Sequence, residues 1–272
     1  FDKGMYPVLK KFAAEPKLIA ARQILLTLPA GVTVRNVTAD GSLSDNATWK
    51  VEPATYFSVS GNTLKTGAAP QAMENAVLTG SFNGFNKPFD LTRIPNVPLK
   101  GEGTEAAPYL ISSTDDWNNL AAYINGTHDN FDGKFLKITA DLEFAAGTFM
   151  PLFSSTADFL MGTLDGDNHS VSGVSMTTTD RYQGPIREVG ASGVIKNLTM
   201  KGKFSSAKAY TGAFTGNVRG KLINCVNEVE LTLTSGSGAS AFGQAYENAV
   251  FEKCVNKAHI TGASTFVAGL VT

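Results

Sequence analysis

The stretch "LDGDNHS", which begins at Leu164, brings three chemically capable side chains together. Asp165 and Asp167 supply two carboxylates and His169 an imidazole, a set that could serve a polysaccharide hydrolase or lyase as acid, base or calcium ligands. The same letters fit a Gly-Asp-Asn turn between two strands, and this interpretation is favoured. Catalysis would require these acids to face others about 5 to 10 Å away on a concave surface.

Other candidate acids and histidines fit loops or the surface better than a site. Asp141 follows an alternating run, and "HDNFDG" contains His128, Asp129 and Asp132. His259 stands alone in "KAHIT". We therefore assign no catalytic or metal-binding residue and expect no cofactor.

Three tyrosines are candidate ligand-binding residues, since exposed aromatic rings can stack on sugar rings: Tyr182, Tyr210 and Tyr246. They fit ordinary loop positions equally well. A modest basic cluster also occurs, comprising Lys196, Lys201, Lys203 and Lys208. The formal net charge is −1, from 23 basic and 24 acidic residues, so no overall field attracts nucleic acid or a membrane.

The two cysteines lie in matching contexts, "INCVNEVELT" and "EKCVNKAHIT". Cys225 and Cys254 could form a metal site or a disulfide, or could mark one structural unit written twice. "VIKNLTMKGKF" and "SVSGVSM" fit the same frame, with Leu198 aligned to Cys225 and Val174 aligned to Leu198. Copies spaced by 24 to 29 residues are typical of a stacked array, and their alternating pattern favours a β-solenoid of four or five coils.

Stacked coils predict columns of inward-facing residues, because each residue lies about 4.8 Å above its counterpart. One column contains Leu198, Cys225 and Cys254, and a second contains Ile186, Phe214, Phe242 and Leu270. The cysteines then act as small core residues. A disulfide is disfavoured by parallel Cβ vectors, and a metal site lacks a nearby histidine. Asn227 and Asn256 are expected to form an internal ladder of side-chain amides.

The N-terminal part contains short alternating strands separated by turns, which indicates an antiparallel sandwich. The segments "LTLPAGVTV", "ATWKVEPATYFSVSGNTLKT" and "AVLTGSFNGFNKPFDLTRIP" resemble bacterial immunoglobulin-like domains of Bacteroidetes surface proteins. We assign residues 1–97 to this domain, with 1–20 as a lead-in segment. The resemblance implies a core made of Trp49, Val59, Leu64, Leu78, Phe82 and Phe89.

One helix is expected just after a linker rich in proline and glycine. Ser113 is the predicted N-cap, and Asp115 and Asp116 fall in the first turn. Trp117 and Ile124 begin and end an apolar stripe. The helix, at about 113–125, precedes the first coil and could cover the open end of the solenoid.

Residues 98–272 resemble GLUG-type repeat proteins of bacterial surfaces. The segment "GEGTEAAPYLISSTDDWNNL" is similar to the entry segment of that family, and "MGTLDGDNHSVSGVSM" is similar to its first repeat. "GPIREVG" and "GAFTGNV" depart from the Gly-Leu-Phe-Gly signature. The resemblance implies a right-handed parallel β-helix in a secreted or surface-anchored protein, and no known catalytic residue.

The sequence thus predicts an all-β protein: an immunoglobulin-like sandwich, then a short right-handed parallel β-helix with one capping helix. The expected function is non-catalytic and adhesin-like, with loops presented to a glycan or a host or surface protein. A carbohydrate-active enzyme and a purely structural spacer are the alternatives. We expect an extracellular or outer-membrane surface location. No targeting signal or transmembrane segment is apparent in the chain, and the uncovered C-terminal end could support end-to-end self-contact.

Overall fold

A computed structural model describes residues 23–26, 32–37, 42–55, 57–66, 74–82, 84–93, 95–178, 180–262 and 266–272. The expected lead-in at 1–20 lies outside these residues. The chain divides into two compact units, residues 1–96 and 97–272. This boundary falls next to the one expected from the sequence.

The first unit contains two sheets of three or more strands that share one apolar core. The larger sheet has the order β1 (Gln23–Leu26), β9 (Phe85–Arg93), β8 (Glu74–Phe82) and β5 (Thr48–Glu52). The smaller has the order β2 (Val32–Thr33), β7 (Thr63–Thr66) and β6 (Phe57–Ser60), and β3 (Asn36–Val37) pairs with β4 (Leu43–Ser44). Leu64, Leu78 and Phe89 are buried in the shared core, as predicted, and Trp49 and Val59 pack against it. Phe82 is only half-buried, and the immunoglobulin-like topology stays a prediction.

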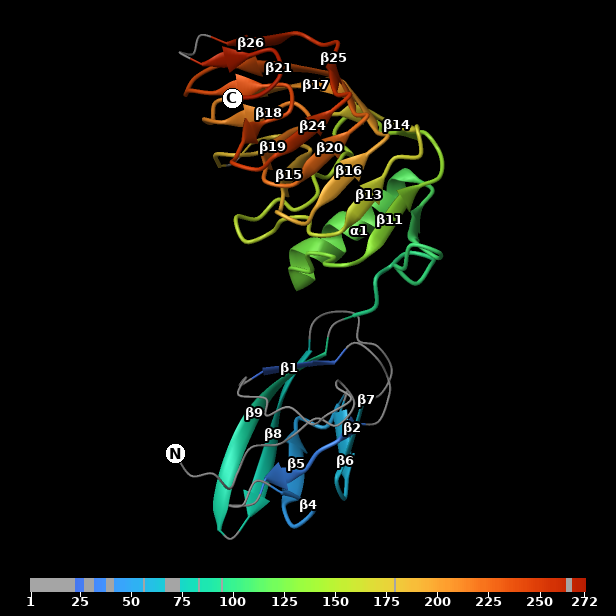
Figure 1. Ribbon diagram of the computed structural model, residues 1–272, viewed down its shortest axis with the longest axis vertical. Helices are drawn as coiled ribbons and strands as arrows, with labels where there is room; N and C mark the ends of the chain where they lie inside the picture. Colours follow the sequence, from blue (N-terminus) through green and yellow to red (C-terminus); the bar gives the residue numbers. More distant parts are fainter. Residues whose placement is uncertain are drawn as a thin grey trace. The chain divides into compact units, whose positions relative to one another are not determined.

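The second unit is a β-solenoid of six coils, in which each coil contributes one strand to a parallel sheet (Figure 1). The first sheet has the order β10 (Tyr109–Ile111), β11 (Phe135–Ile138), β13 (Thr163–Asp165), β16 (Val194–Lys196), β20 (Lys221–Ile223) and β24 (Val250–Glu252). Six coils exceed the four or five expected from the sequence.

Further parallel sheets form the other faces. The second sheet has the order β12 (Leu142–Glu143), β14 (Ser170–Val174), β17 (Thr199–Ser206), β21 (Val226–Leu233) and β25 (Val255–Asn256), and β26 (Ile260–Gly262) also pairs with β21. The small sheets are β15 (Ile186–Val189), β19 (Thr215–Val218) and β23 (Gln244–Ala245), and β18 (Thr211–Gly212), β22 (Ala239–Ser240) and β27 (Val267–Ala268).

The strand register confirms the repeat built on the two cysteines. Leu222 pairs with Phe251, Asn227 with Asn256, and Leu231 with Ile260, as the sequence alignment predicted. Thr199, Val226 and Val255 are partners in successive strands, so the residues that precede them also lie in line. These residues are Leu198, Cys225 and Cys254, of which the first two are fully buried and the third is half-buried.

Two parts of the sequence alignment were wrong. Val174 pairs with Gly202 rather than with Leu198, because the strand pairing shifts register between Val171 and Val174. Ile186 pairs with Thr215, one residue beyond Phe214.

The predicted second column is otherwise present in part. The rings of Phe214 and Phe242 are buried and their centroids lie 5.2 Å apart. Leu270 lies in the last coil and is 41% exposed, so it is not a core residue here.

The helix α1 (Thr114–Thr127) forms as its sequence predicts. The Ser113 hydroxyl accepts a hydrogen bond from the backbone N–H of Asp116 at 3.1 Å, which satisfies one free donor at the helix start. Trp117, Leu120 and Ile124 are fully buried. The indole N–H of Trp117 donates to the carbonyl of Met150 at 2.8 Å.

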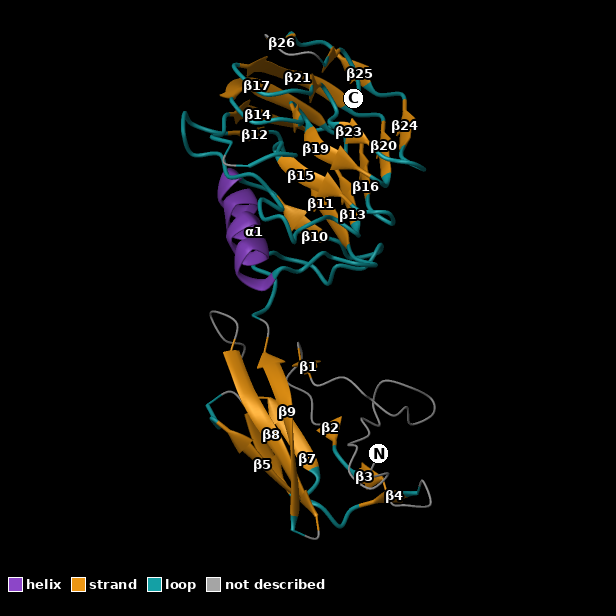
Figure 2. Cartoon of the chain, turned by 90° about the vertical axis from the view of Figure 1, so that its left-hand side faces the viewer, coloured by secondary structure: helices purple, strands orange, loops and turns teal. Residues whose placement is uncertain are grey.

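The helix lies at the β10 and β12 end of the solenoid (Figure 2). In the first coil, the helix comes directly after β10. In the later coils, the corresponding position after the first-sheet strand holds a strand of the second sheet. Trp117 meets the rings of Phe144 and Phe149, which follow β12, at centroid distances of 6.3 and 5.8 Å. The helix therefore covers the first edge of the second sheet, the role expected of a cap.

The opposite end of the solenoid exposes apolar side chains. They are Val250, Val255, Phe266, Val267 and Leu270, all in the sixth coil and between 40% and 61% exposed. Among the residues that the structure describes, no helix is both long and apolar enough to cross a membrane.

Candidate functional site

A shallow groove of about 600 Å³ crosses the outer face of the second sheet. It runs over β14, β17 and β21, and residues that follow β12 also line it, so four successive coils contribute. Apolar, glycine and charged residues line it: Phe144, Ala146, Gly173, Val174, Ser175, Gly202, Lys203, Glu228 and Glu230. Sequence reasoning identified none of these as site residues, although Lys203 was part of the predicted basic cluster.

Two glycines form the floor of the groove because no side chain fits there. A Cβ atom at Gly173 would lie 2.1 Å from the carbonyl oxygen of Phe144, and one at Gly202 would lie 2.2 Å from that of Val174. Gly173 has φ 75° and Gly202 has φ 153°, a region that L-residues with side chains rarely adopt. The absence of side chains at these two positions contributes to the hollow.

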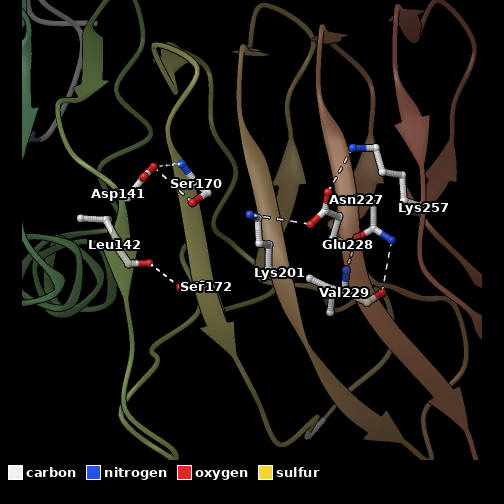
Figure 3. A network of polar contacts seen from close by, with 9 residues as sticks. All are labelled: Asp141, Leu142, Ser170, Ser172, Lys201, Asn227, Glu228, Val229 and Lys257. Carbon is white, nitrogen blue, oxygen red and sulfur yellow. Dashed lines mark hydrogen bonds and ion pairs between the residues drawn. The ribbon is translucent and has the colours of Figure 1, made fainter.

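Charged side chains line the part of the groove formed by β17 and β21. Glu228 lies between two lysines of neighbouring coils, 3.8 Å from Lys201 on β17 and 3.2 Å from Lys257, which follows β25 (Figure 3). Lys203 and Glu230 are register partners on β17 and β21. Within the described part of the chain, neither of these two side chains forms an ion pair. An ammonium and a carboxylate are thus available to a ligand in the groove.

The strand beneath these charges is held by a buried amide. Asn227 donates to the side-chain oxygen of Asn256 at 2.9 Å and to the carbonyl of Val229 at 3.2 Å. It also accepts from the backbone N–H of Val229 at 3.3 Å (Figure 3). The expected asparagine ladder is confirmed, and it fixes β21 where Glu228 and Glu230 emerge.

The "LDGDNHS" stretch lies at the corner between the first and second sheets, and neighbouring coils engage its acids. Asp165 lies 3.1 Å from the Lys196 ammonium and accepts hydrogen bonds from Asn197 at 3.0 Å and from the backbone N–H of Asp167 at 2.9 Å. Burial raises the pKa of Asp165, but these donors outweigh it, so the pKa falls below its usual value. Asp167 pairs with Lys137 at 2.9 Å.

His169 and Asp141 form a second contact at this corner, 3.4 Å apart. Hydrogen bonds from the backbone and side chain of Ser170 lower the pKa of Asp141 (Figure 3). An acid that donates a proton near neutral pH needs a raised pKa. Asp165 and Asp141 are both shifted in the opposite direction, and both act as acceptors between coils.

One buried acid escaped sequence reasoning. Asp158 is 2% exposed and lies 2.7 Å from the Nδ1 atom of His128, which follows helix α1. Asp129 instead accepts from the Tyr123 hydroxyl at 3.0 Å. No local pattern links Asp158 to His128, because the chain passes through a full coil between them.

The three candidate tyrosines occupy two environments. Tyr182 and Tyr210 stack on each other in successive coils, 5.0 Å between centroids and 10° between planes. Gly238 lies against the other side of the Tyr210 ring. A Cβ atom added at Gly238 would lie only 2.7 Å from that ring. Arg219 covers Tyr246 at 3.8 Å from its centroid. Tyr210 therefore offers no open face to a sugar ring, whereas a ligand-binding role for Tyr182 and Tyr246 stays a prediction.

No three His, Cys, Asp or Glu side chains in the described ranges gather closely enough to hold a metal ion. The two cysteines are free thiols.

No family model and no solved structure matches the chain. Similar proteins include a Gly-rich membrane protein of Evansella cellulosilytica, 28% identical over 133 residues, or 47% of this chain. Halomucin of Haloquadratum walsbyi is 29% identical over 203 residues, or 71% of this chain. The chain spans only 15% of the first protein and 2% of the second.

Proposed function

We propose that this chain is a non-catalytic, extracellular module of a bacterial surface protein of the GLUG-repeat type, and that its groove binds a glycan. The observation that carries the proposal is the groove on the second sheet, in which Lys203 and Glu230 have no ion-pair partner among described residues. Their charges, the Ser175 hydroxyl and the backbone at two glycines offer the donors and acceptors that sugar hydroxyls require.

Rigidity supports a binding role. The groove crosses strands of successive coils that are joined by parallel pairing, and the Asn227 amide anchors the strand that carries both glutamates. A preorganised surface loses little conformational entropy when a ligand binds. The relative named as a membrane protein supports placement at the cell envelope.

The acids of "LDGDNHS" support a non-catalytic role. Asp165 and Asp167 are paired with lysines of neighbouring coils, and the lowered pKa of Asp165 is unsuited to a general acid at neutral pH. The carbohydrate-active alternative would need a different constellation of acids.

A glycan array combined with a polysaccharide-degradation screen tests the proposal on the purified chain. We expect binding without sugar release, and at least a tenfold affinity loss, about 1.4 kcal/mol, in Glu230→Gln and Lys203→Met. Glu247→Gln, an exposed acid outside the groove, is the matched control and should bind as the wild type does. Sugar release abolished by Asp165→Ala would establish an enzyme. Binding of proteins only, or of no ligand, would overturn the glycan proposal.

A further inference from the structure

The two cysteines form a pair that the stacking of coils creates. Leu222 with Phe251 and Val226 with Val255 are register partners on either side of them, which places Cys225 directly below Cys254. Neighbouring parallel strands bring such Cα atoms to about 4.8 Å, within the range of about 4.4 to 6.8 Å seen in disulfides. The Cα spacing therefore suits a disulfide, and the parallel Cβ directions leave the approach of the sulfurs to side-chain rotation.

The sulfurs have the same orientation in both coils. Cys225 Sγ lies 3.6 Å from the carbonyl oxygen of Ile195, and Cys254 Sγ lies 3.4 Å from that of Leu222. Ile195 and Leu222 are themselves register partners, so each sulfur leans toward the preceding coil. The sulfur of Cys254 thus leans toward the coil of Cys225, and rotation of the Cys225 side chain to another staggered position can complete the contact.

The two thiols differ in exposure and acidity. Cys225 is fully buried, whereas Cys254 is half-buried in the last coil. The neighbouring Cys225 thiol lowers the pKa of Cys254, against the opposing effect of burial. The same contact, together with burial, raises the pKa of Cys225. The less buried thiol is therefore also the one whose pKa is lowered, which favours the thiolate, the form that attacks disulfides.

We propose that Cys254 is a redox-reactive thiol and that Cys225 is its resolving partner, so that a low-molecular-weight disulfide oxidises the pair to a bond between the fifth and sixth coils. The Cys254 thiolate attacks oxidised glutathione, forming a mixed disulfide and releasing one glutathione thiolate. Cys225 then gives up its proton and attacks the sulfur of Cys254, which releases the second glutathione. The protein loses two electrons and two protons, and glutathione disulfide becomes two thiols.

The test uses the full chain, oxidised glutathione at pH 7 and intact-mass spectrometry with peptide mapping. The wild type should lose two hydrogens and yield one cross-linked peptide pair. Cys225→Ala should stop at one glutathione adduct on Cys254, and Cys254→Ala should stay unmodified while folded. In the Cys225→Ala variant, Cys254 should react with oxidised glutathione faster than Cys225 does in Cys254→Ala, because Cys254 is half-buried and Cys225 is fully buried.

Three outcomes would overturn the proposal: two unreacted thiols in the wild type, a lasting glutathione adduct in the presence of Cys225, or equal reactivity in Cys254→Ala. Because the Cys225 site is fully buried, circular dichroism must show that each variant is folded. Cys225→Val is the second variant, since Leu198 shows that the same column accepts a larger apolar side chain. None of these readouts depends on glycan binding.

Discussion

Replacing Asn227 with alanine tests whether the amide ladder stabilises the solenoid. Asn227 is fully buried in a column that holds apolar Val171 and Met200 in the preceding coils. Truncation removes the side-chain oxygen that accepts from the buried Val229 N–H. It also removes the side-chain N–H that donates to the Asn256 oxygen. Asn256 is only half-buried, so water can replace part of what it loses.

A buried polar group left without a partner costs about 1 to 3 kcal/mol. The Val229 N–H meets this condition fully and Asn256 in part, so we expect Asn227→Ala to reduce the free energy of unfolding by about 3 kcal/mol. The matched control is Asn256→Ala, whose amide bonds Ala258 at 3.1 and 3.2 Å in the same manner. It should cost about 1 kcal/mol because its site is half-exposed.

Urea unfolding followed by circular dichroism measures both variants and the double variant. Because Asn227 donates directly to Asn256, the double variant should be about 1 kcal/mol more stable than the sum of the single losses implies. Additive losses would show that the two amides do not support each other. A loss in Asn227→Ala no larger than that in Asn256→Ala would refute the reasoning from burial.

Two further predictions concern charge and backbone geometry. Asp165→Asn should lower the free energy of unfolding at pH 7, because the lowered folded-state pKa of Asp165 means that its ionised form stabilises the fold. The difference in free energy of unfolding between the variant and the wild type should vanish as the pH falls below the usual carboxyl range. Urea titrations that find the same difference at low pH would contradict this. Gly202→Ala should cost about 2 kcal/mol or more, since the new Cβ would meet Val174 O at 2.2 Å. Gly126 lies in helix α1, and a Cβ added there would have no neighbour within 4 Å, so Gly126→Ala should instead stabilise the protein by about 0.5 to 1 kcal/mol. Equal melting temperatures for the two glycine variants and the wild type would argue against both glycine predictions.

Local patterns predicted much of the fold. Helix α1 was predictable because its cap, its first-turn acids and its apolar stripe all lie within one short segment. The pairing of Cys225 with Cys254 was predictable because the two coils are nearly equal in length. The stacking of Asn227 on Asn256 follows from the same register.

The sequence did not predict features that arise only when separate coils come together. The first coil contains helix α1 in place of a second-sheet strand, so its sequence does not resemble that of the later coils. The number of coils expected from the sequence was therefore too low. The register shift between Val171 and Val174 moved the alignment of Val174, and no spacing rule locates such a shift. The groove arises where residues from four coils meet around two glycines, and the Asp158–His128 contact joins segments a full coil apart.

The parallel stacking of one coil on the next has a consequence for how such chains can change in length. Duplicating or deleting a whole coil would shift everything beyond it by about 4.8 Å along the axis, yet every interior column would find an equivalent neighbour. Recombination between repeats can therefore alter the reach of the rod without redesigning its interior. A fragment of a coil would not be tolerated in this way, because it would put polar residues where the columns require apolar ones.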